Sequence, residues 1–227
     1  RSTPSTERPD PMTDGTLQII PVRGIGEIGR GDDVATAIVD ATRDTEHGLL
    51  DGDVLVVTQK IVSKAEGAMV DIDPSDPLSH KPIVERESVR ILRRRGELII
   101  SETKHGFICA NAGIDLSNVA RGQAALLPDD PDRSARRIRD RLKGAYGVET
   151  AVIVSDTFGR PWRRGVTDVA IGCAGIGAIL DLRGTTDSLG RELMVTEVCV
   201  VDELAAAADL VCGKSAGVPV AIIRGVD

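Results

Sequence analysis

The stretch Ala151-Val152-Ile153-Val154-Ser155-Asp156-Thr157-Phe158-Gly159-Arg160-Pro161-Trp162-Arg163-Arg164-Gly165 changes character after four residues. Its apolar, β-branched start, residues 151–154, predicts a buried strand. The eleven residues that follow hold a carboxylate, two hydroxyls and three arginines, which indicates a polar turn at a strand end. A carboxylate beside arginines suits a site for metal and phosphate, because loops on rigid scaffolds often carry function. A solvated loop is the alternative that these residues alone leave open.

Further apolar runs predict a sheet around this strand. Residues 54–58, Val-Leu-Val-Val-Thr, have the same β-branched character and the same abrupt polar end. We expect other strands at residues 17–22, 97–101, 107–110, 193–201 and 219–225, and helices at residues 34–41, 83–95 and 134–143 and from a cap at Asp202 onward. Strands and helices do not alternate regularly and no internal repeat is present. The predicted fold class is therefore α+β, or an irregular α/β arrangement.

The totals exclude several classes of protein. Of the 227 residues 41% are apolar, which allows a sizeable core, and the net charge of −7 argues against a nucleic-acid binder. Residues 1–15 are polar and predict a disordered tail, which leaves residues 16–227 as one domain. No run approaches the roughly 20 apolar residues of a membrane helix and the start has no signal peptide, so we expect a soluble, cytoplasmic protein. The four cysteines lack zinc-site spacing and are expected to be free thiols.

Two segments have the composition of phosphate-binding loops. Three glycines lie within residues 24–29, where a backbone without side chains can approach a ligand closely. Their spacing matches neither a P-loop nor a dinucleotide fingerprint. Residues 59–67 follow a predicted strand and contain Lys60 and Lys64 in what we expect to be a turn. Their ammonium groups suit a phosphate, and a solvated basic turn is the alternative.

A second polar segment, residues 111–119, is dense in oxygen ligands and also follows a predicted strand. It contains Asp115, and we expect Asp115 and Asp156 to converge on one cation. Mg²⁺ takes one or two carboxylates together with substrate phosphates. These residues indicate a metal-assisted, nucleotide-dependent transfer. The three arginines of the opening stretch suit an acidic substrate, without an assignment of one arginine to one group.

Several long motifs, in order, resemble the coenzyme F420-0:L-glutamate ligase (γ-glutamyl ligase) family. The resemblance extends from Leu17 to Arg224. It is carried by residues 21–24, 51–57, 63–67, 111–119, 155–160, 190–193, 202–208 and 219–225. It implies an unusual mixed α+β fold and an intertwined homodimer with the site near the subunit interface.

The resemblance also implies a reaction in coenzyme F420 biosynthesis. L-Glutamate would be joined through its amine to the terminal carboxylate of coenzyme F420-0, and further glutamates through γ-linkages. The ligase would depend on GTP, form GDP, and proceed through an acyl phosphate. A non-catalytic regulatory protein that binds GTP and metal is the alternative. The number of glutamates added stays open.

Site residues follow from the resemblance position by position. Asp115 and Asp156 would be catalytic and hold the first of two divalent ions, Mg²⁺ or Mn²⁺, and Thr157 the second. A monovalent K⁺ is also implied. GTP would contact Gly24, Ile25, Gly26, Glu27, Lys64 and Asn118.

The chain departs from the family pattern at two places. Gln59-Lys60 stands where relatives offer Ser-Thr, and Lys214 stands where archaeal relatives offer an acidic metal ligand. Actinobacterial-type relatives carry an additional C-terminal flavin-binding domain. The sequence is compatible both with a separate ligase and with the N-terminal half of such a bifunctional protein.

Overall fold

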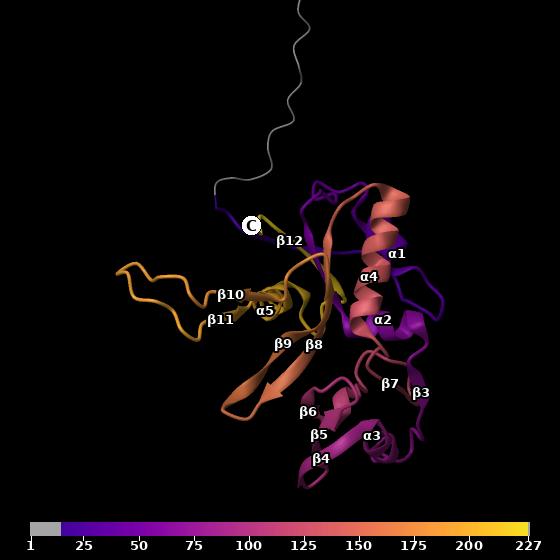
Figure 1. Cartoon of the computed structure of the whole chain (residues 1–227). Helices are drawn as coiled ribbons and strands as arrows, with labels where there is room; N and C mark the ends of the chain where they lie inside the picture. The colour runs from indigo at the N-terminus through magenta and orange to yellow at the C-terminus, as the bar shows by residue number, and fades with distance from the viewer. Residues whose placement is uncertain (1–14, 227) are drawn as a thin grey trace, which may run out of the picture.

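The computed structural model describes residues 15–226, and a five-stranded sheet forms its centre (Figure 1). In spatial order the strands are β1 (Gln18–Val22), β12 (Val220–Arg224), β2 (Val54–Thr58), β8 (Ala151–Arg160) and β9 (Arg163–Ala174). Strands β2 and β8 are parallel, and the other three pairs are antiparallel. The tail predicted at residues 1–15 lies, apart from Gly15, outside the described residues.

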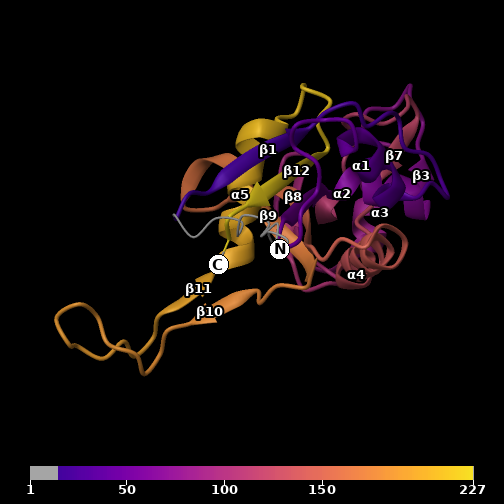
Figure 2. The ribbon, with the colours of Figure 1, turned by 90° about the horizontal axis from the view of Figure 1, so that it is seen from above.

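Helices cover both faces of this sheet. On one face lie α1 (Val34–Thr42), α2 (Gln59–Glu66) and α4 (Pro131–Arg141), and α5 (Val200–Cys212) lies on the other (Figures 1 and 2). Side chains alternate along β2, so Leu55 and Val57 join the first layer while Val54 and Val56 pack against α5. All four are buried, as expected for a central strand covered on both faces.

Strand β12 is inserted between β1 and β2, although it is the last strand described. Its end is fixed by Arg224, whose guanidinium donates two hydrogen bonds of 2.8 Å to the buried carboxylate of Asp53. This bidentate, charge-assisted contact locks the strand beside the residue that precedes β2.

A smaller lobe lies below the main sheet in Figure 1. It contains α3 (Lys81–Glu87), β4 (Ser88–Arg95), β5 (Leu98–Thr103), β6 (Ile108–Ala110) and η1 (Asn111–Gly113), and next to them β3 (Met69–Asp71) paired with β7 (Gln123–Ala125). Its own core contains Val84, Ile99 and Ala112. The hairpin β10 (Ile179–Asp181) and β11 (Glu197–Cys199) extends away from the body in both views, and a π-helical turn η2 (Leu142–Tyr146) follows α4.

The helix predicted at residues 83–95 is wrong in its second half. Helix α3 ends at Glu87, and residues 88–95 form strand β4. Strand β4 pairs antiparallel with β5, and Arg90 forms an ion pair of 2.9 Å with Glu102 across the two strands. The apolar residues of this segment lie in a strand because pairing with β5 outweighs the local preference for a helix.

Two segments expected as turns are regular elements. Residues 59–66 form α2, which begins directly after β2 and ends at Gly67 with a left-handed φ of 74°. The polar residues 155–160 continue strand β8, which pairs with β9 as far as Arg160. Backbone hydrogen bonds of a strand do not depend on side-chain polarity, so polar composition alone indicated the wrong element.

The start of α5 also differs from expectation. The helix begins at Val200, and the strand expected at residues 193–201 is restricted to β11. Asp202 lies in the first turn, where its carboxylate accepts a hydrogen bond of 2.9 Å from the Ala170 backbone of β9. Asp202 therefore links α5 to the sheet and does not cap the helix.

The other predicted strands and helices are present with shifted ends, and mixed helices and sheets agree with the predicted α+β class. Within the described residues the four cysteines are free. No helix between residues 15 and 226 has the length and apolar character needed to cross a membrane.

The close approach of β9 to α4 gives a stability prediction. A Cβ added at Gly172 would lie 2.4 Å from the carbonyl carbon of Pro131 and 2.6 Å from the backbone nitrogen of Asp132. Gly172→Ala should therefore lower the free energy of unfolding by about 3 kcal/mol, measured by urea denaturation. Gly177→Ala is the matched control, because nothing lies within 4 Å of an added Cβ there. Equal effects of the two changes would contradict this packing.

Candidate functional site

The parallel pairing of β2 with β8 brings two chain segments together at their carboxyl ends. Thr58, the last residue of β2, is in register with Ser155 of β8. Helix α2 therefore starts beside Asp156, the next residue along β8. Ligands of open α/β sheets bind outside the carboxyl ends of such strands. A cavity of about 400 Å³ lies here, and we call it the central cavity.

The central cavity collects nearly all of the site residues expected from the sequence. The loop before α1, helix α2, the loop after η1 and strand β8 supply its walls. The expected residues that line it are Ile25, Gly26, Glu27, Lys64, Asp115, Asn118, Asp156 and Thr157. Gly24 is not among the lining residues and turns the backbone into this wall with a φ of 84°. The arrangement brings these residues together, and their individual roles stay predictions.

Asp156 is the most perturbed acid of the cavity. Burial raises its pKa to about 7, although a hydrogen bond from the Thr157 backbone N–H lowers this pKa in part. The nearby charges of Asp115 and Asp168 raise this pKa further, and Lys214 lowers it. A buried carboxylate among other carboxylates requires a proton or a cation to offset its charge.

Asp115 is held ionised by direct partners. Lys60 Nζ lies 2.7 Å from one carboxylate oxygen, and the Ser117 backbone N–H donates to the other at 2.7 Å. Burial alone would raise the pKa of Asp115, but the hydrogen bonds from Lys60 and Ser117 outweigh it and leave the pKa below its usual range. Lys60 also donates to the Ser117 hydroxyl at 2.9 Å, so one ammonium group fixes the whole turn.

Two further aspartates face the cavity and escaped the sequence reasoning. Asp168 of β9 is buried and accepts hydrogen bonds from the hydroxyls of Thr157 (2.7 Å) and Ser155 (3.0 Å). Asp209 lies on α5, and burial followed by the charge of Asp168 raises its pKa. Asp168 could have been found from the sequence, because it lies within an otherwise apolar segment and a buried carboxylate needs hydrogen-bond partners.

Basic and amide groups close the cavity from two sides. Lys64 of α2 forms an ion pair with Glu27, which joins the glycine-containing loop to the helix. Asn118 donates a hydrogen bond of 3.1 Å to the backbone oxygen of Lys214, which joins the Asp115 loop to the loop after α5. The nucleotide contacts expected on Lys64 and Asn118 would therefore replace or extend contacts that already exist.

Asp115, Asp156 and Thr157 offer oxygen ligands of the kind that a divalent cation takes together with a substrate. Residues 15–226 contain no group of three or more His, Cys, Asp or Glu side chains arranged to hold a metal ion. Asp115 and Asp156 supply two carboxylates, and Thr157 a hydroxyl oxygen. Magnesium sites of this type are completed by water and by substrate phosphates. The buried, negatively surrounded Asp156 is consistent with such an ion.

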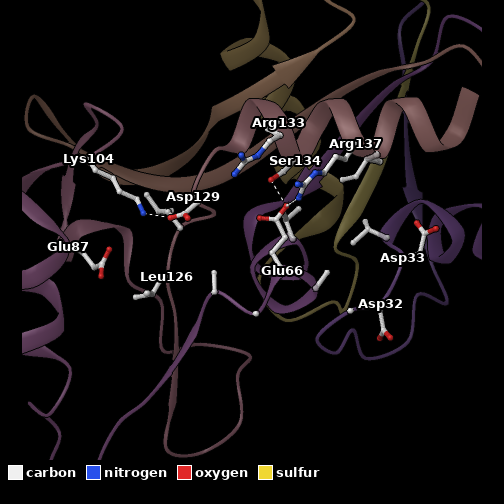
Figure 3. A pocket seen from close by; sticks show the side chains of 18 residues that line it. Asp32, Asp33, Glu66, Glu87, Lys104, Leu126, Asp129, Arg133, Ser134 and Arg137 are labelled. Carbon is white, nitrogen blue, oxygen red and sulfur yellow. Dashed lines mark hydrogen bonds and ion pairs between the residues drawn. The ribbon is translucent and has the colours of Figure 1, made fainter.

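A larger hollow of about 590 Å³ lies on the opposite side of α2 (Figure 3). Several of its charged groups already have partners within the hollow. Glu66 accepts a hydrogen bond of 2.6 Å from the Ser134 hydroxyl and forms an ion pair of 3.8 Å with Arg137, and Lys104 pairs with Asp129. None of the expected site residues lines this hollow. The central cavity is therefore the better candidate for a phosphate and metal site.

Comparison with known proteins places this architecture among ligases. A family model described as F420-0:Gamma-glutamyl ligase matches residues 24–225. The chain is 47% identical to a protein of Methanothermobacter thermautotrophicus, over 92% of this chain and 89% of that protein. It is 42% identical to a protein of Methanopyrus kandleri and 39% identical to one of Archaeoglobus fulgidus, each over 93% of this chain and 88% of the relative. All three relatives are named coenzyme F420:L-glutamate ligase.

The raised pKa of Asp156 predicts how stability depends on pH. Between the ordinary value of 3.8 and about 7, the native protein binds more protons than the unfolded chain. Metal-free wild type should therefore lose stability as pH rises through this window. Asp156→Asn removes the titration, so its stability relative to wild type should increase by about 2 kcal/mol between pH 5 and pH 8. Urea denaturation in a chelating buffer measures this, and a pH-independent difference would contradict it.

Proposed function

Because the chain belongs to the F420-0:gamma-glutamyl ligase family, we propose that it joins L-glutamate to coenzyme F420-0 in coenzyme F420 biosynthesis. The observation that carries this proposal is the central cavity itself. Segments that are far apart in the chain supply Asp115, Asp156 and Lys64 to one cavity at the end of two parallel strands. A ligase that uses a nucleotide needs this combination of carboxylates and ammonium groups around one reaction centre.

The proposed reaction has two steps and uses GTP. A carboxylate oxygen of the acceptor attacks the γ-phosphorus of GTP, the bond to GDP breaks, and an acyl phosphate forms. The amine of L-glutamate then attacks the acyl carbon, loses a proton and expels inorganic phosphate. Both steps develop negative charge on phosphate oxygens, which positive groups in a partly buried cavity stabilise.

Each named residue has a part in this proposal. Asp115, Asp156 and Thr157 would hold two divalent ions, Mg²⁺ or Mn²⁺, and K⁺ is the proposed monovalent ion. Divalent ions supply charge neutralisation and orientation of the phosphates. Lys64 would exchange its ion pair with Glu27 for a nucleotide phosphate. The backbone of residues 24–27 would approach the phosphates closely, because its glycines have no side chain that would separate the backbone from a ligand.

We also propose that the protein acts as a homodimer. The hairpin formed by β10 and β11 reaches away from the body (Figure 1). The loop between its two strands carries large exposed apolar side chains. Leu189 is 92% exposed and Val195 84% exposed in the single chain. Exposed apolar side chains gathered on one projecting segment are typical of a protein interface.

The ligase proposal predicts a product of defined mass. Incubation with GTP, Mn²⁺, L-glutamate and coenzyme F420-0 should add one glutamate or more, detected by mass spectrometry, with GDP formed in equal number. Asp156→Asn should lower kcat at least a thousandfold while the protein stays folded, because a cation ligand is lost. Asp40→Asn, at an exposed carboxylate of α1 that does not line the central cavity, is the control and should retain activity.

A folded protein that binds GTP but forms no product would overturn the proposal and favour the regulatory alternative. Full activity of Asp156→Asn would move the reaction centre away from the central cavity.

Lys60 gives a second prediction, independent of turnover. Its ammonium group occupies one oxygen of Asp115 at 2.7 Å and repels any cation that binds there. Lys60→Met should therefore tighten Mn²⁺ binding about tenfold in calorimetric titrations without substrates. Lys104→Met removes an equal charge at the larger hollow, where Lys104 pairs with Asp129, and should leave the Mn²⁺ Kd unchanged. Weaker Mn²⁺ binding by Lys60→Met would show that this lysine supports the metal site.

A further inference from the structure

The tip of the β8–β9 hairpin, residues 159–165, concentrates positive charge close to the central cavity. Arg160, Arg163 and Arg164 lie within five positions, and no acidic residue occurs between Thr157 and Thr167. Within residues 15–226 none of the three arginines lies within 4.0 Å of a carboxylate, since the ion pairs of the described chain all involve other residues. We call this segment the basic tip. No ion pair of the described residues neutralises the charge of the basic tip, which leaves it available to an anionic ligand.

Arg160 is partly enclosed at the basic tip. Its Nε is buried and has no hydrogen-bond partner in the described part of the chain. The guanidinium folds back along the hairpin, because Nη2 would lie 3.8 Å from a Cβ added at Gly165. Gly165 has a left-handed φ of 96°, which favours glycine at this position. A buried N–H without an acceptor is unfavourable, and an anionic group placed there would satisfy it.

The basic tip is connected to the reaction centre by a single continuous strand. Asp156 and Arg160 are four residues apart on β8, which corresponds to about 13 Å. The β8–β9 register shifts between Gly159 and Arg160, but the extra residues, 164 and 165, lie on β9, so the even spacing along β8 places Asp156 and Arg160 on the same face. Phe158 lies between them and contacts Phe107 of the smaller lobe in an edge-to-face geometry, with ring centroids 5.8 Å apart. One face of the hairpin therefore leads from the central cavity, past the smaller lobe, to the arginines.

Trp162 adds an apolar surface to the same tip. It is the only tryptophan in the sequence, and it is 74% exposed between Arg160 and Arg163. An exposed indole beside guanidinium groups suits a ligand that combines negative charge with a flat or apolar part. Guanidinium groups bind carboxylates and phosphates through paired hydrogen bonds, which lysines do not provide.

We propose that the basic tip binds the outer part of the acceptor substrate, an anionic molecule whose reacting carboxylate lies at Asp156. This inference rests on the proposed function, because it places the acceptor of that reaction. Arg160, with its partly enclosed guanidinium, binds an anionic group of the acceptor. Arg163 and Arg164 add long-range attraction, and Trp162 packs on its apolar part. The tip thereby selects the acceptor, while GTP and L-glutamate do not contact it.

Binding of coenzyme F420-0 without GTP tests this directly. We expect its Kd, from quenching of Trp162 fluorescence and from calorimetry, to rise at least tenfold in Arg160→Gln and in the double variant Arg163→Gln/Arg164→Gln. The Kd of Arg160→Lys should stay close to that of Arg160→Gln, because a lysine cannot form the paired hydrogen bonds of a guanidinium group. The double variant Arg93→Gln/Arg95→Gln is the matched control. It removes the same charge from exposed arginines of β4 that also lack a described ion pair, and its Kd should equal that of wild type.

Kinetics separate the acceptor from the other substrates. In the basic-tip variants the KM for coenzyme F420-0 should rise while the KM values for GTP and L-glutamate stay unchanged. A Kd equal to that of wild type would overturn the inference, as would an equal loss in the β4 control. If the variants instead change only the elution volume in size-exclusion chromatography, the tip is a contact between copies of the chain. Wild type that binds coenzyme F420-0 through the basic tip without forming product would overturn the proposed function and leave the tip as a binding site for this molecule.

Discussion

The parallel pairing of β2 with β8 is the constraint on which the candidate site depends. Its register, with Thr58 opposite Ser155, sets which side chains of β8 point into the central cavity. Ser155, Asp156 and Thr157 all line the cavity, and because side chains alternate along a strand, a slip by one residue would turn Asp156 to the face of β8 that its two hydroxyl-bearing neighbours now occupy. The apolar residues of both strands are buried on two faces and exclude such a slip. A packing requirement of the core therefore fixes the chemistry at its edge.

The central cavity gathers like charges at some cost to stability. Asp115, Asp156, Asp168 and Asp209 all line it, and burial raises the pKa of Asp156 and of Asp209. Hydroxyls and one lysine offset part of this repulsion, at Asp168 and at Asp115. The remaining unfavourable charge is typical of functional sites, where the rest of the structure holds residues in arrangements that they would not adopt alone.

Local patterns in the sequence were sufficient for elements whose stability is local or fully buried. The apolar run at residues 54–58 and the helical spacing at residues 34–41 both give elements where expected. The helix predicted over residues 88–95 is wrong, because these residues form a strand through pairing with β5. Polar segments after strands pointed to the candidate site, but the strand conformation of residues 155–160 comes from pairing with β9, which the polar composition of residues 155–165 does not indicate.

The candidate site likewise combines residues that the sequence predicts with contacts that only the folded chain creates. Asp115 and Asp156 were recognisable from their polar surroundings and from family motifs, and the structure places both in one cavity. The pairing of Lys60 with Asp115 and of Asp168 with Thr157 depends on residues brought together by folding. Gln59, which departs from the family pattern, donates a hydrogen bond of 2.6 Å to the backbone of Leu126 and is buried. This contact links the start of α2 to the segment after β7, and the sequence alone does not indicate it.

The position of β12 has a consequence for biosynthesis. This strand lies between β1 and β2, so the main sheet has a gap until residues 220–224 have left the ribosome. Until then β1 has no partner in the sheet, and Asp53 lacks the guanidinium of Arg224. Contacts between segments so far apart in sequence form slowly, because a long loop must close first. The nascent chain therefore exposes apolar strand edges until residues 220–224 emerge, and such edges favour aggregation at that stage.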